Sequence, residues 1–235
     1  MGTGASNQLL AALPADEMRR LYSELEPTTL ASRTTLFEAG SRLKHVYFPV
    51  SATVSLLHVM ADGKTAEVAS VGADGLVDVC VVLGDATSSR AVVRNAGQAY
   101  RVSVEALRRE FRRGGRLQGL VMRYASRMIT HLSQAAACNR HHSVDQQLCR
   151  WLLTSLDGVA SDELLTTQEL IAGMLGVRRE GVTQAARALQ RAGLIRYSRG
   201  RISILSRARL EQRACECYAT GLDQTLRFRA NLLKI

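Results

Sequence analysis

The segment LGVRREGVT, which ends at Thr183, places two arginines and a glutamate directly behind a glycine. Arginine can donate two hydrogen bonds to guanine, glutamate can accept one from the cytosine amino group, and glutamine can pair with adenine. A helix that begins near Arg178 carries in its first two turns the side chains of Arg179, Glu180, Thr183 and Gln184. These residue types favour contact with DNA base edges. The plain alternative, a solvated start of a helix, stays open.

Other polar residues in this region suit contacts with the DNA backbone. Thr167 and Gln168 stand where a preceding helix begins, so a hydroxyl, an amide and backbone N–H groups can hold a phosphate there. Arginines farther along the second helix and in the following turn can reach phosphates on either side. The residues expected to meet the backbone are Thr167, Gln168, Arg178, Arg187, Arg199 and Arg201.

These side chains require a helix-turn-helix and a hairpin to position them. Thr167 is a good N-cap for a short helix to Leu175, and Gly176 suits the left-handed turn that ends it. A second helix is expected from near Arg178 to about Ala192. The β-prone runs 194–197 and 201–205 then predict a hairpin that forms a wing.

The charge of the chain is concentrated around the same region. The formal net charge is +10 and the sequence pI is near 10.0. Residues 1–104 carry nine Lys or Arg against ten Asp or Glu, whereas residues 178–213 carry ten Arg against two Glu. A local basic excess of this kind points to a polyanion partner.

Composition limits the other classes of protein. Hydrophobic residues at 46% and charged residues at 22% describe a globular chain, and no apolar run approaches the roughly 18 residues of a membrane span. The five scattered cysteines form neither a disulfide framework nor a paired zinc motif, which fits a reducing cytoplasm.

The residues before the helix-turn-helix predict a β domain and one long helix. Short β-prone runs from Leu36 to Val104, separated by turn signals, predict a sandwich or barrel, and a leading helix is plausible over residues 15–25. A long amphipathic helix is predicted over residues 117–139. Its length suggests that the apolar stripe pairs with a second copy of the chain, with packing against its own sandwich as the alternative. The stripe comprises Leu117, Leu120, Val121, Tyr124, Met128, Leu132 and Ala135.

The helix-turn-helix carries a resemblance to a known family. The series Thr167-x-Glu169-x-Ile171-Ala172-x-x-Leu175-Gly176-Val177-x-Arg179-Glu180-x-Val182, followed by Leu189 and Gly193-Leu194-Ile195, resembles the Crp/Fnr transcription regulators. The resemblance implies an α+β chain: a jelly-roll, cyclic-nucleotide-binding-like β roll (1–115), a long dimerisation helix (116–142), a winged helix-turn-helix (143–217) and a tail (218–235). It also implies that Arg179 and Glu180 contact bases. Gln184 stands where the family usually has a third base-reading arginine, so a different DNA preference is expected.

The same resemblance locates a candidate effector pocket. Family members that bind a cyclic nucleotide follow the glycine at Gly75 with a glutamate, where this chain has Leu76. They place an arginine before a Ser/Thr-Ala pair, whereas here Arg90 follows Ser89 and precedes Ala91. Ser133 is a looser match. Cyclic AMP or cyclic GMP is therefore the minority expectation, and another small-molecule effector, or none, is favoured.

Metal cofactors are not expected from the sequence. An iron-sulfur cluster of the family type needs closely spaced N-terminal cysteines, and the first cysteine is Cys80; haem is not expected either. Thiolates and imidazoles where the long helix meets the winged domain suit zinc or copper, but simple burial is the favoured explanation. The residues concerned are Cys138, His141, His142 and Cys149, with Cys215-x-Cys217 as a further thiol pair.

The sequence thus favours a cytoplasmic, homodimeric bacterial regulator of transcription that binds double-stranded DNA, with RNA polymerase a partner by resemblance. The alternative is a ligand-sensing module that acts through a protein partner and keeps a vestigial DNA-binding domain. An enzyme is least supported, because the chain lacks a nucleophile elbow, a P-loop and HExxH.

Overall fold

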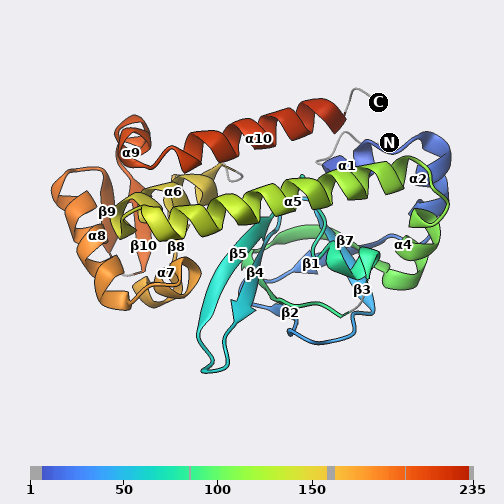
Figure 1. Cartoon of the computed structure of the whole chain (residues 1–235), viewed down its shortest axis with the longest axis horizontal. Helices are drawn as coiled ribbons and strands as arrows, with labels where there is room; N and C mark the ends of the chain where they lie inside the picture. The colour runs from blue at the N-terminus through green and yellow to red at the C-terminus, as the bar shows by residue number, and fades with distance from the viewer. Residues whose placement is uncertain (1–6, 85, 158–161, 199, 233–235) are drawn as a thin grey trace. The chain divides into compact units, whose positions relative to one another are not determined.

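Short antiparallel strands build the part of the chain before Val104, as the sequence predicts (Figure 1). One sheet has the order β1 (Glu26–Leu30), β7 (Gly97–Ser103), β3 (His45–Pro49). The other has the order β2 (Thr35–Phe37), β6 (Arg90–Asn95), β4 (Thr53–Val59), β5 (Thr65–Val71). Strand β1 was not predicted, because the run EPTTL contains a proline and buries only its last residue.

The computed structural model describes residues 7–84, 86–157, 162–198 and 200–232. It divides into two compact units, residues 1–61, 68–130 and 226–235 in the first, and residues 62–67 and 131–225 in the second. None of the described helices combines the length and the hydrophobicity that crossing a lipid bilayer requires.

Four short helices complete the β roll of the first unit. They are α1 (Gln8–Ala11), α2 (Ala15–Tyr22), α3 (Cys80–Leu83) and α4 (Val104–Phe111). Helix α2 matches the helix predicted for residues 15–25. Leu21 on α2, Phe48 on β3 and Leu107 on α4 are buried together in one hydrophobic core.

The long helix α5 (Arg116–His141) begins on a buried carboxylate. The backbone N–H groups of Arg116 and Leu117 donate to Glu17 of α2 over 2.7 and 2.8 Å. A carboxylate at a helix N-terminus satisfies unpaired donors and opposes the helix dipole. Gly115 permits this approach, because a Cβ atom there would lie 2.4 Å from Glu17 Oε1.

Much of the apolar stripe of α5, which was expected to form the dimer surface, is buried within its own chain. Leu117, Leu120, Val121 and Tyr124 are buried in the core of their own chain and are not available to a partner, so for these residues the alternative of packing against the chain's own sandwich holds. Met128 packs partly against the same core, whereas Leu132 is 39% exposed and Ala135 is half-buried. The large apolar side chains that α5 exposes most are Ile129, at 65%, and Met122, at 53%.

The second unit contains a winged helix, together with the end of α5. The first helix of the winged helix, α6 (Val144–Leu156), begins with the predicted capping box between Ser143 and Gln146. The elements that follow are β8 (Glu163–Leu165), α7 (Gln168–Leu175), α8 (Arg179–Arg191), β9 (Ile195–Ser198), β10 (Arg201–Ile204) and α9 (Arg207–Arg213). The sheet order is β8, β10, β9, so a third strand, which was not predicted from the sequence, joins the predicted hairpin.

The final helix, α10 (Cys217–Leu232), gives the predicted tail a structural role. Phe228 and Leu232 are buried in the same core as Tyr124 of α5. The Arg127 guanidinium lies 4.8 Å from the centre of the Phe228 ring, and Arg116 donates to the carbonyl of Leu232 over 2.8 Å. The last turns of the described chain therefore complete the core of the first unit.

Candidate nucleic-acid interface

The helix-turn-helix has the local geometry that its sequence predicts. The hydroxyl of Thr167 accepts a hydrogen bond from the backbone N–H of Leu170 over 3.2 Å, as an N-cap does. Gly176 ends α7 in the left-handed conformation, with φ of 65°. Arg178 occupies the N-cap position of α8, so the charged segment opens the second helix of the pair.

Helix α8 has one buried and one exposed face. Its buried side chains pack against α6 and α7, and they are those expected from the sequence: Val182, Ala185, Ala186 and Leu189. Arg178, Arg179, Glu180, Gln184 and Arg187 are exposed, and Thr183 is half-buried. A helix held along one face in this way can present the other to a groove of DNA.

A surface hollow lies between α8 and the hairpin. Its volume is about 430 Å³, and it is lined by Gln168, Arg179, Thr183, Arg187, Gln190, Tyr197, Ser198 and Gly200. Four of the predicted DNA-contacting residues therefore lie together. Gln190 and Tyr197 were missed, although Gln190 follows Thr183 by seven residues and so shares its helix face.

Hydrogen bonds position the polar groups of the hollow. Thr183 Oγ1 donates to Gln168 Oε1 over 2.6 Å, which links the two helices and leaves the amide NH₂ of Gln168 as a donor. Tyr197 donates its hydroxyl to the carbonyl of Thr166 over 3.3 Å, and burial raises the pKa of that hydroxyl. Arg179 lies 4.0 Å from Glu169, and both side chains are mostly exposed, so this ion pair restrains Arg179 only weakly.

The hairpin carries less unpaired positive charge than the count of residues 178–213 suggests. Arg201 forms a 2.8 Å salt bridge with Glu163 of β8, which lies outside the counted segment. Both side chains are about half exposed, so the pair contributes little to stability and its arginine can exchange partners. The second predicted wing residue, Arg199, lies outside the described residues.

The six residues proposed for an effector pocket have different surroundings in the structure. Leu76 and Ala91 are fully buried in hydrophobic cores, and a Cβ at Gly75 would overlap the Tyr124 ring. Arg90 forms a 2.6 Å salt bridge with Glu38. Ser89 donates its backbone N–H to the hydroxyl of Thr87, and Ser133 is exposed on α5 in the second unit.

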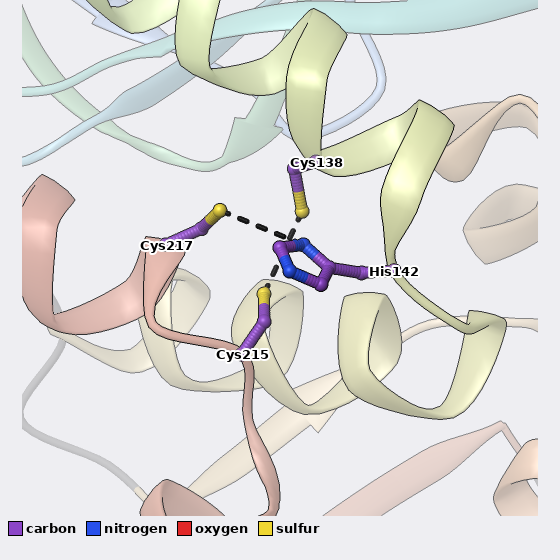
Figure 2. Close-up of side chains that lie close together, drawn as sticks. All are labelled: Cys138, His142, Cys215 and Cys217. Carbon is purple, nitrogen blue, oxygen red and sulfur yellow. Dashed lines mark hydrogen bonds between the residues drawn. The ribbon is translucent and has the colours of Figure 1, made fainter.

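The structure does bring together four thiol and imidazole side chains at the base of the winged helix. Cys138, His142, Cys215 and Cys217 point toward one another, and their potential ligand atoms all lie within 4.8 Å of one another (Figure 2). His141 is exposed, and neither His141 nor Cys149 belongs to the group. Burial raises the pKa of the Cys138 thiol to about 12 and also raises that of Cys217.

Two parts of the chain match known domain families. Residues 146–213 match the Crp-like helix-turn-helix domain, and residues 27–113 match the cyclic nucleotide-binding domain. The first match contains α7, α8 and the hairpin, and the second contains both sheets apart from the first residue of β1. A comparison with curated protein sequences found no significant match.

Solved structures share the fold over most of the chain. A putative Crp/Fnr regulator from Eubacterium rectale is 18% identical with a TM-score of 0.73, covering 87% of this chain and 96% of its own. The c-di-GMP-responsive regulator CLP of Xanthomonas campestris is 17% identical with a TM-score of 0.70, covering 82% and 100%. A CRP-family regulator from Thermus thermophilus is 21% identical with a TM-score of 0.65, covering 80% and 96%.

These relatives are transcription regulators rather than enzymes. They share the α+β architecture expected from the sequence, in which a β-rich domain, a long helix and a helix-turn-helix follow one another. The chain belongs to the Crp/Fnr family of transcription regulators.

Proposed function

We propose that this chain acts as a homodimeric regulator that binds a two-fold DNA site, with one α8 helix from each subunit in the major groove. The observation that carries the proposal is the exposed, arginine-rich face of α8 beside the hollow and the hairpin. Such a surface offers base-reading groups at the start of the helix and phosphate-binding groups around it.

The exposed residues take separate roles in this proposal. Arg179, Glu180 and Gln184 contact base edges, because they stand in the first two turns of α8. Thr183 holds the side chain of Gln168 in the hollow. Phosphate contacts are assigned to Thr167, Gln168, Arg178, Arg187, Arg199 and Arg201. RNA polymerase is the proposed protein partner, by family resemblance, and the cytoplasm the proposed location.

The effector in this proposal is not cyclic AMP held in the usual family manner. Leu76 replaces the glutamate that would accept a ribose hydroxyl, and it is buried. The Arg90 guanidinium is already paired with Glu38. CLP, a structural relative, is described as responsive to c-di-GMP, so members of this fold respond to other ligands.

Selection of binding sites from random duplex DNA tests the DNA-binding proposal. We expect one preferred sequence with half-sites about 34–36 Å apart, and an affinity that falls with salt by a log–log slope of about −0.9 per phosphate contacted. Selections with and without cyclic AMP should return the same site. Binding without sequence preference would instead favour a protein partner and a vestigial DNA domain.

The proposed dimer surface is the exposed face of α5. Met122, Ser126, Ile129, Ser133 and Ala136 are exposed, and they follow one another at alternating steps of four and three residues. This spacing is that of a two-helix seam, and the serines and the alanine allow close approach of the backbones. Leu132, on the predicted stripe, lies beside the seam and is also exposed.

Substitution of Ile129 by glutamate is expected to convert the dimer to a monomer, because an unpaired carboxylate in an apolar seam costs several kcal/mol. Analytical ultracentrifugation over a range of concentrations measures the change, and affinity for the selected DNA site should fall with it. Arg123→Glu, on another exposed face of α5, is the control and should remain dimeric. An unchanged dimer in Ile129→Glu would show that the partner contacts a different surface.

A further inference from the structure

A compact set of soft metal ligands joins two segments that are distant in the sequence. Cys138 and His142 lie one turn apart at the end of α5, where the N–H of His142 donates to the carbonyl of Cys138 over 3.0 Å. Cys215 and Cys217 flank Glu216 between α9 and the start of α10. All four residues belong to the second unit, and the close-up shows their side chains converging (Figure 2).

We propose that Cys138, His142, Cys215 and Cys217 bind a zinc ion. Three sulfurs and one imidazole nitrogen form a donor set typical of structural zinc sites, which are tetrahedral. With Zn–S bonds of about 2.3 Å and Zn–N bonds of about 2.0–2.1 Å, neighbouring ligand atoms lie about 3.5–3.8 Å apart. The Sγ atoms of Cys138 and Cys215 are 3.6 Å apart, and Cys217 Sγ lies 3.7 Å from His142 Nδ1.

The imidazole is already oriented for this role. His142 Nε2 lies 3.1 Å from Glu216 Oε1, so the carboxylate holds a proton on Nε2 and leaves the lone pair of Nδ1 for the metal. Zinc-bound histidines almost always donate their other ring N–H to a carboxylate, carbonyl or water. Glu216 lies between Cys215 and Cys217, so one short segment supplies two of the three sulfurs and the orienting carboxylate.

A half-buried arginine balances the charge of the proposed site. Three thiolates around one divalent ion leave a net charge of −1. The positive charge of Arg150 on α6 acts on Cys138, and Arg150 Nε is buried without a hydrogen-bond partner among the described residues. An anionic metal–thiolate group next to this guanidinium would compensate its charge.

A Cys138–Cys215 disulfide explains the same residues less fully. It would use two sulfurs and leave the convergence of Cys217 and His142, and the orientation of His142 by Glu216, without a cause.

Four protein ligands would fill the coordination sphere of the proposed zinc ion, so the zinc would be structural rather than catalytic.

The position of the site suggests what the zinc would do. His142 and Cys215 bracket residues 143–214, which hold α6 to α9 and the hairpin. A metal ion that joins these two ends closes the loop that contains the helix-turn-helix and lowers the conformational entropy of the unfolded chain. The free energy of metal binding therefore adds to the stability of the fold. It would also fix the end of α5 where the chain enters α6.

The test uses the full chain, reduced and free of metal-binding tags. Elemental analysis after reconstitution with Zn²⁺ should find one ion per chain, and Co²⁺ should give the visible bands of tetrahedral thiolate coordination. Cys138→Ser and Cys215→Ser should lose the ion, whereas Cys149→Ser, a buried cysteine outside the group, should retain it. Glu216→Gln, which leaves the ligands intact, should weaken Zn²⁺ affinity about 10- to 100-fold.

Three results would overturn the proposal. One is a reduced, folded wild-type chain that takes up neither Zn²⁺ nor Co²⁺. Another is loss of the ion from Cys149→Ser to the same extent as from Cys215→Ser. The third is a Cys138–Cys215 disulfide, found by thiol trapping and mass spectrometry in freshly lysed cells. Each measurement is made without DNA, so the outcome is independent of the proposed regulatory function.

Discussion

Arg179→Ala is expected to lower the affinity for the selected DNA site by about 2–6 kcal/mol, or roughly 30-fold to 10⁴-fold. One bidentate arginine–guanine contact is worth about 1–3 kcal/mol, and a two-fold site contains it twice. The loss should be accompanied by relaxed preference at one base pair of each half-site. Fluorescence anisotropy with the selected and a scrambled duplex, at one fixed salt concentration, measures both effects.

The control for this prediction lies on the same helix. Arg191 is exposed in the last turn of α8, beyond the residues expected to enter the groove. Arg191→Ala removes the same charge, so it should weaken the selected and scrambled duplexes by the same small factor. If Arg179→Ala also weakens both duplexes equally, then Arg179 contacts phosphate rather than a base.

Leu232→Ala is expected to destabilise the first unit by about 2–5 kcal/mol. Leu232 is 3% exposed in the core that α10 completes, and removal of a buried leucine side chain leaves a cavity. Urea denaturation, monitored by the hydrogen exchange of backbone amides in β3 and β7, measures the stability of this unit. The single tryptophan, Trp151 on α6, reports separately on the second unit and should respond less.

A matched substitution on the same helix controls for helix propensity. Leu226 is 54% exposed, so Leu226→Ala should change the stability by no more than about 0.5 kcal/mol. Equal effects of the two substitutions would indicate that α10 does not pack into the first unit in solution.

The sequence predicted the features that depend on local rules. Thr167 as an N-cap, Gly176 as a left-handed helix end and the capping box of Ser143 with Gln146 all follow from short-range backbone chemistry. The buried stripe of α8 follows from helical periodicity. These features also carry the family resemblance, so the winged helix was predicted more completely than the rest.

Periodicity was insufficient for α5, because it reveals an apolar face without revealing what covers that face. Leu117, Leu120, Val121 and Tyr124 read as a dimer stripe, yet their own chain buries them. Part of the cover comes from Phe228 and Leu232, which lie about a hundred residues later. No local pattern connects the two helices.

The sequence pointed to all four residues of the cysteine cluster, but it did not group them, and simple burial was the favoured explanation. Neither Cys138-x-x-x-His142 nor Cys215-x-Cys217 has the spacing of a common zinc motif, and each pair alone is incomplete. One signal was available: His142 follows Cys138 by four residues and so shares its helix face, whereas His141 does not. The meeting of the two segments depends on how α6 to α9 fold between them.

The burial of α10 residues in the first unit has a consequence for biosynthesis. At roughly 5–20 residues per second, translation of the hundred or so residues between Thr130 and Leu232 takes on the order of 5–20 s. During that time part of the apolar core of the β roll stays exposed, because Phe228 and Leu232 have not yet been synthesised. Residues 143–214 are all synthesised before the core of the first unit can be completed, so the unit that begins first along the chain is completed last. Slower translation should therefore prolong the exposure of the nascent protein to chaperones and proteases.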